Sequence, residues 1–283
     1  MVAVVGVGAG PGYAEVAFGS VWVGNHQGNS ISRIDPVTNA VVATISVPGE
    51  PTGVTAAFDA IWTYTPLDRL LKRVDPATNA VVATGALEDE GGSITGVQAL
   101  AGSIWFAGDS GHVRRIDPVA MTVLSSLDMT NDCAGSLATA AALLWYASLC
   151  GGSGVAIIDP ATAAGPTVKS TVAVPGANAV WSGLDAVWVS SVDGGITKID
   201  PATGAVIASG TAGPRAEQLR TGMGAVWVRV DGRTLVRMDP ATVQVTATYV
   251  LPPSPIPGGG IAIGDDAVWA VNFGQATVWR IKP

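Results

Sequence analysis

The sequence predicts an all-β fold, a seven-bladed β-propeller with four antiparallel strands in each blade, and three observations support this. An apolar-Trp pair occurs seven times along the 283 residues, with 40, 43, 40, 43, 39 and 42 residues between successive tryptophans. An Asp-Pro pair follows each of the first six tryptophans after 12 to 14 residues. Short runs rich in Val, Ile and Thr, separated by Gly, Asp and Pro, fill each repeat. Four strands in a unit of this length are typical of propeller blades.

The repeat assigns the whole chain, residues 1–283, to one propeller domain. Because one tryptophan stands at a fixed offset in every repeat, we expect these side chains to pack between blades. The repeat tryptophans are Trp22, Trp62, Trp105, Trp145, Trp188, Trp227 and Trp269. The blades are expected at residues 11–47, 51–87, 94–128, 134–174, 177–210, 216–251 and 258–283, the last completed by residues 2–8.

The two ends of the chain are expected to complete the last blade together. The seventh repeat contains three strand-like runs but lacks the fourth, and residues 2–8 (VAVVGVG) match the outer-strand pattern of residues 41–47 (VVATISV). The N-terminal strand should therefore pair with the last repeat and remove an open sheet edge. Within each repeat, the Asp-Pro-x-Thr-Asn/Gly segment predicts a hairpin turn, because Pro presets φ and Asn or Gly tolerates positive φ.

Composition narrows the classes of function. Hydrophobic residues make up 48% of the chain and charged residues 13%, which is enough apolar material for a sizeable core. The formal net charge is −7, and the only lysines are Lys72, Lys169, Lys198 and Lys282. An acidic chain without a basic stripe argues against nucleic acid and anionic membranes as partners. The sequence has no run of 18 apolar residues and so predicts no transmembrane segment. We expect a monomer.

A candidate ligand site comes from residues that break the repeat on the first strand of each blade. Eight residues before each tryptophan the side chain is small or aliphatic, so this position should pack between sheets. The positions seven and nine residues before it should then point into the central channel, because a strand alternates its faces. The charged, amide-bearing or aromatic side chains at these positions are Tyr13, Glu15, Gln98, Trp181, Gln218 and Arg220.

These six residues have two interpretations. Charges in a confined channel are costly unless they are paired, so Glu15 and Arg220 could satisfy each other or bind channel water and do nothing more. Alternatively they form a polar ligand pocket, in which Arg220 binds an anionic or carbonyl group while Trp181 or Tyr13 stacks on it.

The loops that should share a face with this pocket add candidates for catalysis and for a crosslink. Glu15, His26 and His112 are candidate general bases, although for each histidine alone a solvated loop residue is the favoured interpretation. Cys133 and Cys150 fall in two loops of the fourth blade, where a disulfide would close a loop of about 17 residues and contribute about 3 kcal/mol. The alternatives are two buried thiols or a redox pair. The sequence shows no Cys/His cluster with zinc spacing, so no metal site is predicted.

The repeat unit resembles a known family of propeller repeats. Residues 51–62 (PTGVTAAFDAIW) and 32–45 (SRIDPVTNAVVATI) are similar to the YVTN-type repeats of bacterial and archaeal surface proteins, and the similarity extends over the whole chain. The same superfamily includes streptogramin (virginiamycin B) lyase, a seven-bladed propeller. That resemblance implies a metal-dependent elimination that uses histidine and glutamate on blade loops. The histidines of this chain are His26 and His112.

Three functions follow from the sequence. The first is a secreted or otherwise extracytoplasmic bacterial propeller that binds a small molecule, glycan, peptide or protein at its loop face and channel mouth. Its export signal would then lie outside this sequence, and a disulfide would fit an oxidising compartment. The second is a lyase or hydrolase of the streptogramin-lyase kind, acting in the channel mouth. No cofactor is predicted for the binding protein, whereas an enzyme could use a divalent cation. The third is a sensor or scaffold domain of a longer chain.

Overall fold

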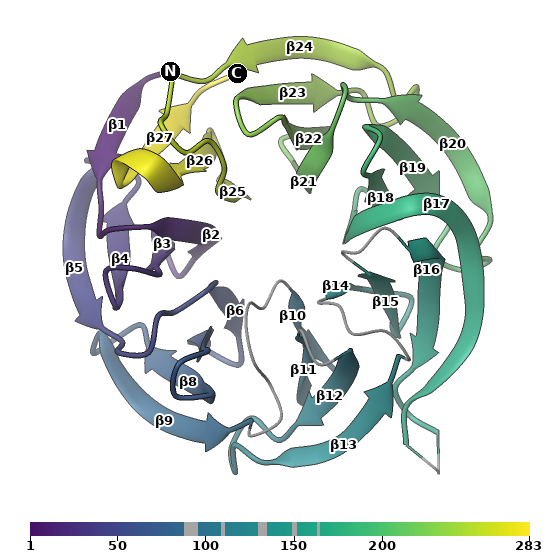
Figure 1. Ribbon diagram of the computed structural model, residues 1–283, viewed down its shortest axis with the longest axis horizontal. Helices are drawn as coiled ribbons and strands as arrows, with labels where there is room; N and C mark the ends of the chain where they lie inside the picture. Colours follow the sequence, from purple (N-terminus) through teal and green to yellow (C-terminus); the bar gives the residue numbers. More distant parts are fainter. Residues whose placement is uncertain (88–95, 109–110, 130–134, 149–151, 163–164) are drawn as a thin grey trace. The chain divides into compact units, whose positions relative to one another are not determined.

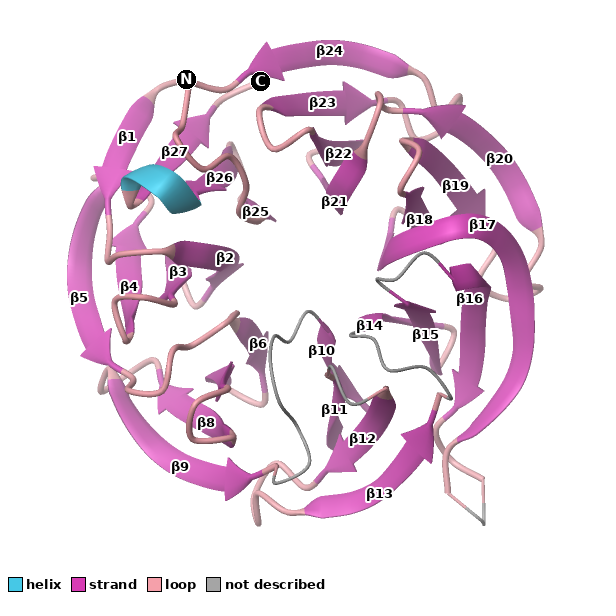
Figure 2. Cartoon of the chain, in the orientation of Figure 1, coloured by secondary structure: helices cyan, strands magenta, loops and turns pink. Residues whose placement is uncertain are grey.

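The computed structural model describes residues 1–283 except 88–95, 109–110, 130–134, 149–151 and 163–164. The described residues form β-strands and turns, with one short 3₁₀ helix at Phe273–Gln275 (Figure 2). The chain divides into two compact units, which are described separately below. Unit 1 contains Met1–Ser93, Val119–Thr122 and Pro252–Pro283, and unit 2 contains Ile94–Pro118 and Val123–Leu251.

Unit 1 holds three sheets of four antiparallel strands (Figure 1). The first sheet is β2(Pro11–Ala17), β3(Ser20–Asn25), β4(Ser30–Asp35) and β5(Ala40–Ser46). The second sheet is β6(Thr55–Ala57), β7(Ala60–Thr65), β8(Leu70–Asp75) and β9(Ala80–Ala86). The third sheet is β25(Ile261–Ile263), β26(Val268–Asn272), β27(Thr277–Ile281) and β1(Ala3–Gly6).

The N-terminal strand completes the third sheet, as the sequence predicted. Strand β1 pairs antiparallel with β27, and Val5 lies opposite Val278. Val5 is 5% exposed and packs in a hydrophobic cluster with Val278 and Val271. Figure 1 shows the purple N-terminal strand beside the yellow C-terminal strand. The two ends of the chain are therefore joined within unit 1 by a hydrogen-bonded strand pair.

Unit 2 holds two sheets of four antiparallel strands and one sheet of seven. The four-stranded sheets are β10(Gly96–Leu100), β11(Ser103–Ala107), β12(His112–Ile116), β13(Val123–Asp128), and β21(Ala216–Gly222), β22(Ala225–Val230), β23(Thr234–Met238), β24(Val245–Val250). The seven-stranded sheet is β14(Gly135–Ala140), β15(Leu143–Ser148), β16(Gly152–Asp159), β17(Thr167–Gly183), β18(Ala186–Ser191), β19(Gly195–Ile199) and β20(Val206–Thr211).

Strand β17 differs from the expectation of a break between residues 174 and 177. It runs unbroken over 17 residues, pairing with β16 along its first part and with β18 along its second part (Figure 1). Gly176 lies in its middle with φ +71, and its carbonyl accepts a hydrogen bond from Val192 N at 2.9 Å. Glycine adopts this left-handed conformation without steric cost. The chain can therefore change direction at Gly176 while β17 stays paired first with β16 and then with β18. Repeats 4 and 5 consequently share one sheet.

The prediction of four-stranded antiparallel blades is confirmed for the five repeats that form separate sheets. Within each unit, the repeat tryptophan of one sheet packs against the next sheet. Trp22 is fully buried and clusters with Val54 and Ile61 of the following sheet. Trp188 clusters in the same way with Leu219 and Val228. The tryptophan-bearing face of one sheet therefore packs on the opposite face of the next, as expected for core residues placed at a fixed offset.

The Asp-Pro segments form the predicted turns, and the aspartate organises each one. Asp35 Oδ1 accepts hydrogen bonds from Val37 N at 2.7 Å and Thr38 N at 3.2 Å, and Asn39 has φ +59. These N–H donors hold the pKa of the Asp35 carboxyl below its usual value. Three further turn aspartates have a pKa lowered mainly by the same kind of bond, namely Asp75, Asp200 and Asp239.

A basic side chain on the third strand links neighbouring sheets. Arg33 lies over the indole of Trp22, with Cζ 4.8 Å from the ring centroid, and its Nη1 donates to Pro76 O at 2.7 Å in the next Asp-Pro turn. Lys198 repeats this arrangement in unit 2, with Nζ 5.3 Å from the Trp188 ring and a 2.8 Å bond to Pro240 O. The cation thus stabilises both the tryptophan and the turn of the following repeat.

Candidate functional site

The strand register shows where the predicted site residues lie relative to the repeat tryptophans. Glu15, Gln98 and Arg220 each stand directly opposite a repeat tryptophan on the second strand of the sheet. Directly opposed residues share a sheet face. The side chains of Glu15, Gln98 and Arg220 therefore leave the first strand on the sheet face that carries the repeat tryptophan. Their sequence distance from the tryptophan did not by itself show which face they share with it.

The expected burial eight residues before the tryptophan is present on six of the seven first strands. The buried residues at this position are Ala14, Val54, Leu137, Val180, Leu219 and Ile261, whereas Val97 is partly exposed. The predicted site residues Tyr13, Glu15, Gln98, Trp181, Gln218 and Arg220 are all partly exposed. Tyr13 and Glu15 belong to unit 1, and the other four belong to unit 2. Their convergence on one cavity stays a prediction.

Arg220 and Trp181 are brought together within unit 2. The guanidinium carbon of Arg220, on β21, lies 3.8 Å from the ring centroid of Trp181, on β17. Arg220 Nη1 also donates to Leu219 O at 2.9 Å, so the side chain bends back along its own strand to reach the neighbouring indole. A guanidinium stacked on tryptophan is held in a fixed orientation and gains about 0.5–2 kcal/mol from the cation–π interaction.

Two other polar side chains on first strands have structural partners. Gln98 Nε2 donates to Leu137 O at 3.1 Å, on the first strand of the following repeat. Asn178 Nδ2 makes a comparable bond to Ala216 O at 3.3 Å. Both amides link one first strand to the next. Gln98 therefore contributes to sheet packing, which the sequence could not distinguish from ligand binding.

His26 lies against Glu50, a partner that the sequence analysis did not identify. His26 Nδ1 is 3.2 Å from Glu50 O, and His26 Nε2 is 3.3 Å from Glu50 Oε2. Both side chains are about one-third exposed, at 32% and 34%. The pair forms because Asn29 Oδ1 accepts bonds from the backbone N–H groups of Gly49 and Glu50, which holds the two loops of unit 1 together.

The other histidine among the candidate general bases, His112, belongs to unit 2. It begins β12 and stands opposite Asp128 of β13. Among the described residues, no group of three or more His, Cys, Asp or Glu side chains is arranged to hold a metal ion. Cys133 and Cys150 lie outside the described residues, so the disulfide stays a prediction.

Arg229 is a second residue that the sequence analysis missed. It stands opposite Gln218 in the register of β21 and β22, is 1% exposed, and donates from Nη2 to Gly232 O at 2.8 Å. Burial lowers the pKa of Arg229 to about 10, while the nearby charge of Glu217 raises it. The guanidinium therefore stays charged at neutral pH. The signal was available in the repeat, because Arg229 is two residues after a repeat tryptophan.

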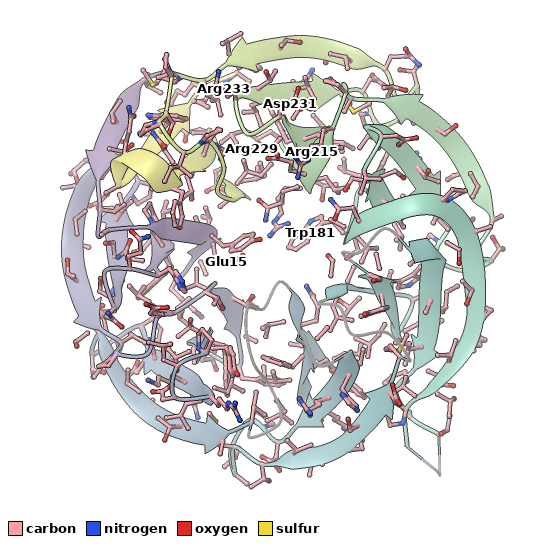
Figure 3. The ribbon with its side chains drawn as sticks, in the orientation of Figure 1. Glu15, Trp181, Arg215, Arg229, Asp231 and Arg233 are labelled. Atoms are coloured by element: carbon pink, nitrogen blue, oxygen red, sulfur yellow. The ribbon has the colours of Figure 1, made fainter. Side chains whose placement is uncertain are left out.

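At the end of the same sheet, two loops carry further charges. Asp231 N donates to Arg215 O at 3.2 Å, and Arg233 N donates to Val230 O at 3.2 Å. Arg215 Nε lies 3.8 Å from Glu217 Oε1, and the Arg215 side chain is 69% exposed. Figure 3 shows Arg215, Arg229, Asp231 and Arg233 gathered on this sheet. We call Arg215, Arg220, Arg229 and Arg233 the arginine group of the β21–β24 sheet.

Comparisons with known proteins address the fold. No protein-family model matches the sequence, and no curated protein matches it. The described residues contain no helix long and apolar enough to cross a membrane.

Solved structures are similar over nearly the whole chain. A streptogramin B lyase has a TM-score of 0.80 at 17% identity, covering 97% of this chain and 94% of its own. Hydrazine synthase of Kuenenia stuttgartiensis has a TM-score of 0.79 at 14% identity, covering 98% and 96%. The computationally designed Ika8 protein has a TM-score of 0.71 at 13% identity, covering 98% of both chains. At these identities the similarity establishes that the fold of this chain is a β-propeller.

Proposed function

We propose that this protein is a binding propeller whose ligand docks at Arg220 and Trp181 through an anionic or carbonyl group. The observation that supports this most directly is the stacking of the Arg220 guanidinium on Trp181, with Cζ 3.8 Å from the ring centroid and both side chains partly exposed. A planar guanidinium held in this way presents donors in a fixed geometry that suits carboxylates, phosphates and carbonyls.

The other cation–tryptophan contacts of the chain provide an internal comparison. Arg33, Arg73, Arg115, Lys198 and Arg280 lie over repeat tryptophans, at 4.8 to 5.9 Å from the ring centroids. Those indoles are at most 1% exposed and belong to the core. Trp181 is not a repeat tryptophan, and its contact with Arg220 is shorter and partly exposed. Core packing explains the five repeat contacts, whereas Trp181 packs only at the partly exposed edge of the buried cluster that contains Trp188 and Leu219.

The finer architecture is part of the same proposal. We propose seven blades, counting the seven-stranded sheet as two that share β17, with the first strands around a central channel. An extracytoplasmic location and a Cys133–Cys150 disulfide complete this proposal, together with YVTN-type repeats as its sequence family.

A ligand screen on matched variants tests the binding site. Small carboxylates, phosphates and amides are screened by thermal shift, and hits are titrated calorimetrically with wild type, Arg220→Ala, Trp181→Ala and Arg237→Ala. We expect the first two variants to weaken binding at least tenfold, since a hydrogen bond to a charged group contributes about 1.5–3 kcal/mol. Arg237 lies on β23 and bonds to Thr246 Oγ1 at 3.2 Å, so its loss should leave affinity unchanged. Equal affinity in all four proteins would exclude the site.

A second candidate function is a lyase, favoured by the His26–Glu50 pair. Both ring nitrogens of His26 face oxygens of Glu50, so the Glu50 carboxylate is the group that could take a proton from a substrate, with His26 orienting it. Incubation with streptogramin B, followed by mass spectrometry, would detect ring opening. Under this alternative the wild type converts the substrate and His26→Asn does not. An unchanged substrate in the wild-type sample would argue against lyase activity on this compound.

A further inference from the structure

The charge of the β21–β24 sheet differs from that of the chain. The whole protein has a formal net charge of −7. Between residues 215 and 233, however, four arginines stand against two acidic residues, Glu217 and Asp231, which gives a local net charge of +2. All six belong to β21, β22 or the loops at their ends, so this excess is confined to one sheet of unit 2.

The repeat provides six internal controls for Arg229. The positions two residues after the other repeat tryptophans carry uncharged side chains, all buried, namely Gly24, Tyr64, Ala107, Ala147, Ser190 and Val271. A buried guanidinium costs several kcal/mol of desolvation that an apolar residue does not. The fold therefore does not need a charge here, and Arg229 breaks the repeat at a cost in stability.

The contact made by Arg229 indicates what the charge does. Its Nη2 donates to Gly232 O at 2.8 Å, inside the loop that joins β22 to β23. The same loop carries Arg233, which is exposed. A hydrogen bond from Asp231 N to Arg215 O, 3.2 Å long, joins this loop to the residue that precedes β21. Arg229 thus stabilises the loop that carries Arg233, and Figure 3 shows both arginines near Arg215 on this sheet.

We propose that the ligand of the Arg220–Trp181 site is an anion rather than a neutral carbonyl compound, and that Arg215 and Arg233 draw it toward Arg220. This inference rests on the proposed binding function and specifies its ligand class. Arg215 and Arg220 are five positions apart in sequence, roughly 15–17 Å at about 3.4 Å per residue. Charges at this range raise the local concentration and the association rate of an anion, and salt screens the effect.

The test uses phenyl phosphate as the anionic probe and benzamide as its neutral counterpart. The association rate and affinity of each probe are measured for wild type, the double variant Arg215→Gln/Arg233→Gln, Arg220→Ala and Arg237→Gln. We expect phenyl phosphate to bind the wild type, with about a five- to tenfold loss in the double variant at low salt, consistent with weak exposed charge interactions. The loss should shrink at 0.5 M NaCl. Arg237→Gln serves as the charge-matched control.

The outcomes separate this inference from the proposed function. If benzamide binds as well as phenyl phosphate and both need Arg220, the site stands but its selection for anions is wrong. If phenyl phosphate binds the double variant as tightly and as fast as the wild type, the roles of Arg215 and Arg233 are likewise wrong. If neither probe binds the wild type, or if binding does not depend on Arg220, both proposals fail.

Discussion

At the scale of single residues, Trp181 and Trp188 form a matched pair that separates core packing from ligand binding. They stand directly opposite each other on β17 and β18, yet Trp188 is fully buried and Trp181 is partly exposed. Trp188→Ala should lower the free energy of unfolding by about 3–5 kcal/mol, as large-to-small core substitutions do. Trp181→Ala should cost less, about 1–2 kcal/mol, from the lost cation–π contact and from lost packing against the edge of the cluster around Trp188. Urea unfolding measures both, and equal losses would contradict a functional role for Trp181.

Arg229 permits a second residue-level prediction, in which stability and binding respond differently. Replacing a buried charge by an apolar residue of similar size is often neutral or stabilising, by about 1–4 kcal/mol. Arg229→Leu should therefore leave the free energy of unfolding unchanged or raise it. The same variant should weaken phenyl phosphate binding, because the loop that carries Arg233 loses its bond from Arg229 to Gly232 O. A destabilised variant that binds normally would show that Arg229 serves the fold alone.

At the scale of secondary-structure elements, strand β1 is the clearest test of how unit 1 is completed. All four of its residues pair with β27, and Val5 contributes to the adjoining cluster. Deleting residues 2–7 leaves β27 as an unpaired edge, and such edges promote association between chains. We expect a lower melting temperature in calorimetry and dimers or larger species in light scattering. A monomer with the melting temperature of the full-length chain would contradict this.

The Asp-Pro turns predict how stability depends on pH. The turn N–H groups lower the folded pKa of Asp35, Asp75, Asp200 and Asp239, so these carboxylates stabilise the fold above their unfolded pKa of about 4. That contribution is lost as pH falls below about 4 and through the lower folded values. Calorimetry between pH 6 and pH 2 should show a falling melting temperature. Replacing all four by Asn should flatten the profile, and an unaltered profile would exclude the turns as its origin.

At the scale of the whole molecule, the regular spacing of the tryptophans explains how much the sequence could predict. The tryptophan offset locates the strands of each repeat, the Asp-Pro pairs locate the turns, and the match between residues 2–8 and 41–47 locates the strand that completes the third sheet. The unbroken strand β17 was missed because Gly176 does not differ in the sequence from a glycine that ends a strand. The Glu50 partner of His26 was missed because it depends on how two loops meet, which Asn29 determines.

Candidate site residues could be identified only where a residue departs from the repeat. Trp181, Arg220 and Gln218 were proposed in this way, and Arg229 would have been noticed by comparing the positions two residues after each tryptophan. Gln98 shows the limit of the method, since its bond to Leu137 O is structural. A departure from the repeat identifies an unusual residue, and its contacts then distinguish packing from binding.

A crystal structure of the protein soaked with phenyl phosphate would test the central claim most directly. We expect the phosphate oxygens within about 3 Å of the Arg220 guanidinium nitrogens, with Arg220 still stacked on Trp181. We also expect the same soak of Arg220→Ala crystals to show no phosphate at this position. Phosphate bound elsewhere on the molecule, with Arg220 contacting only protein atoms, would contradict anion binding at Arg220.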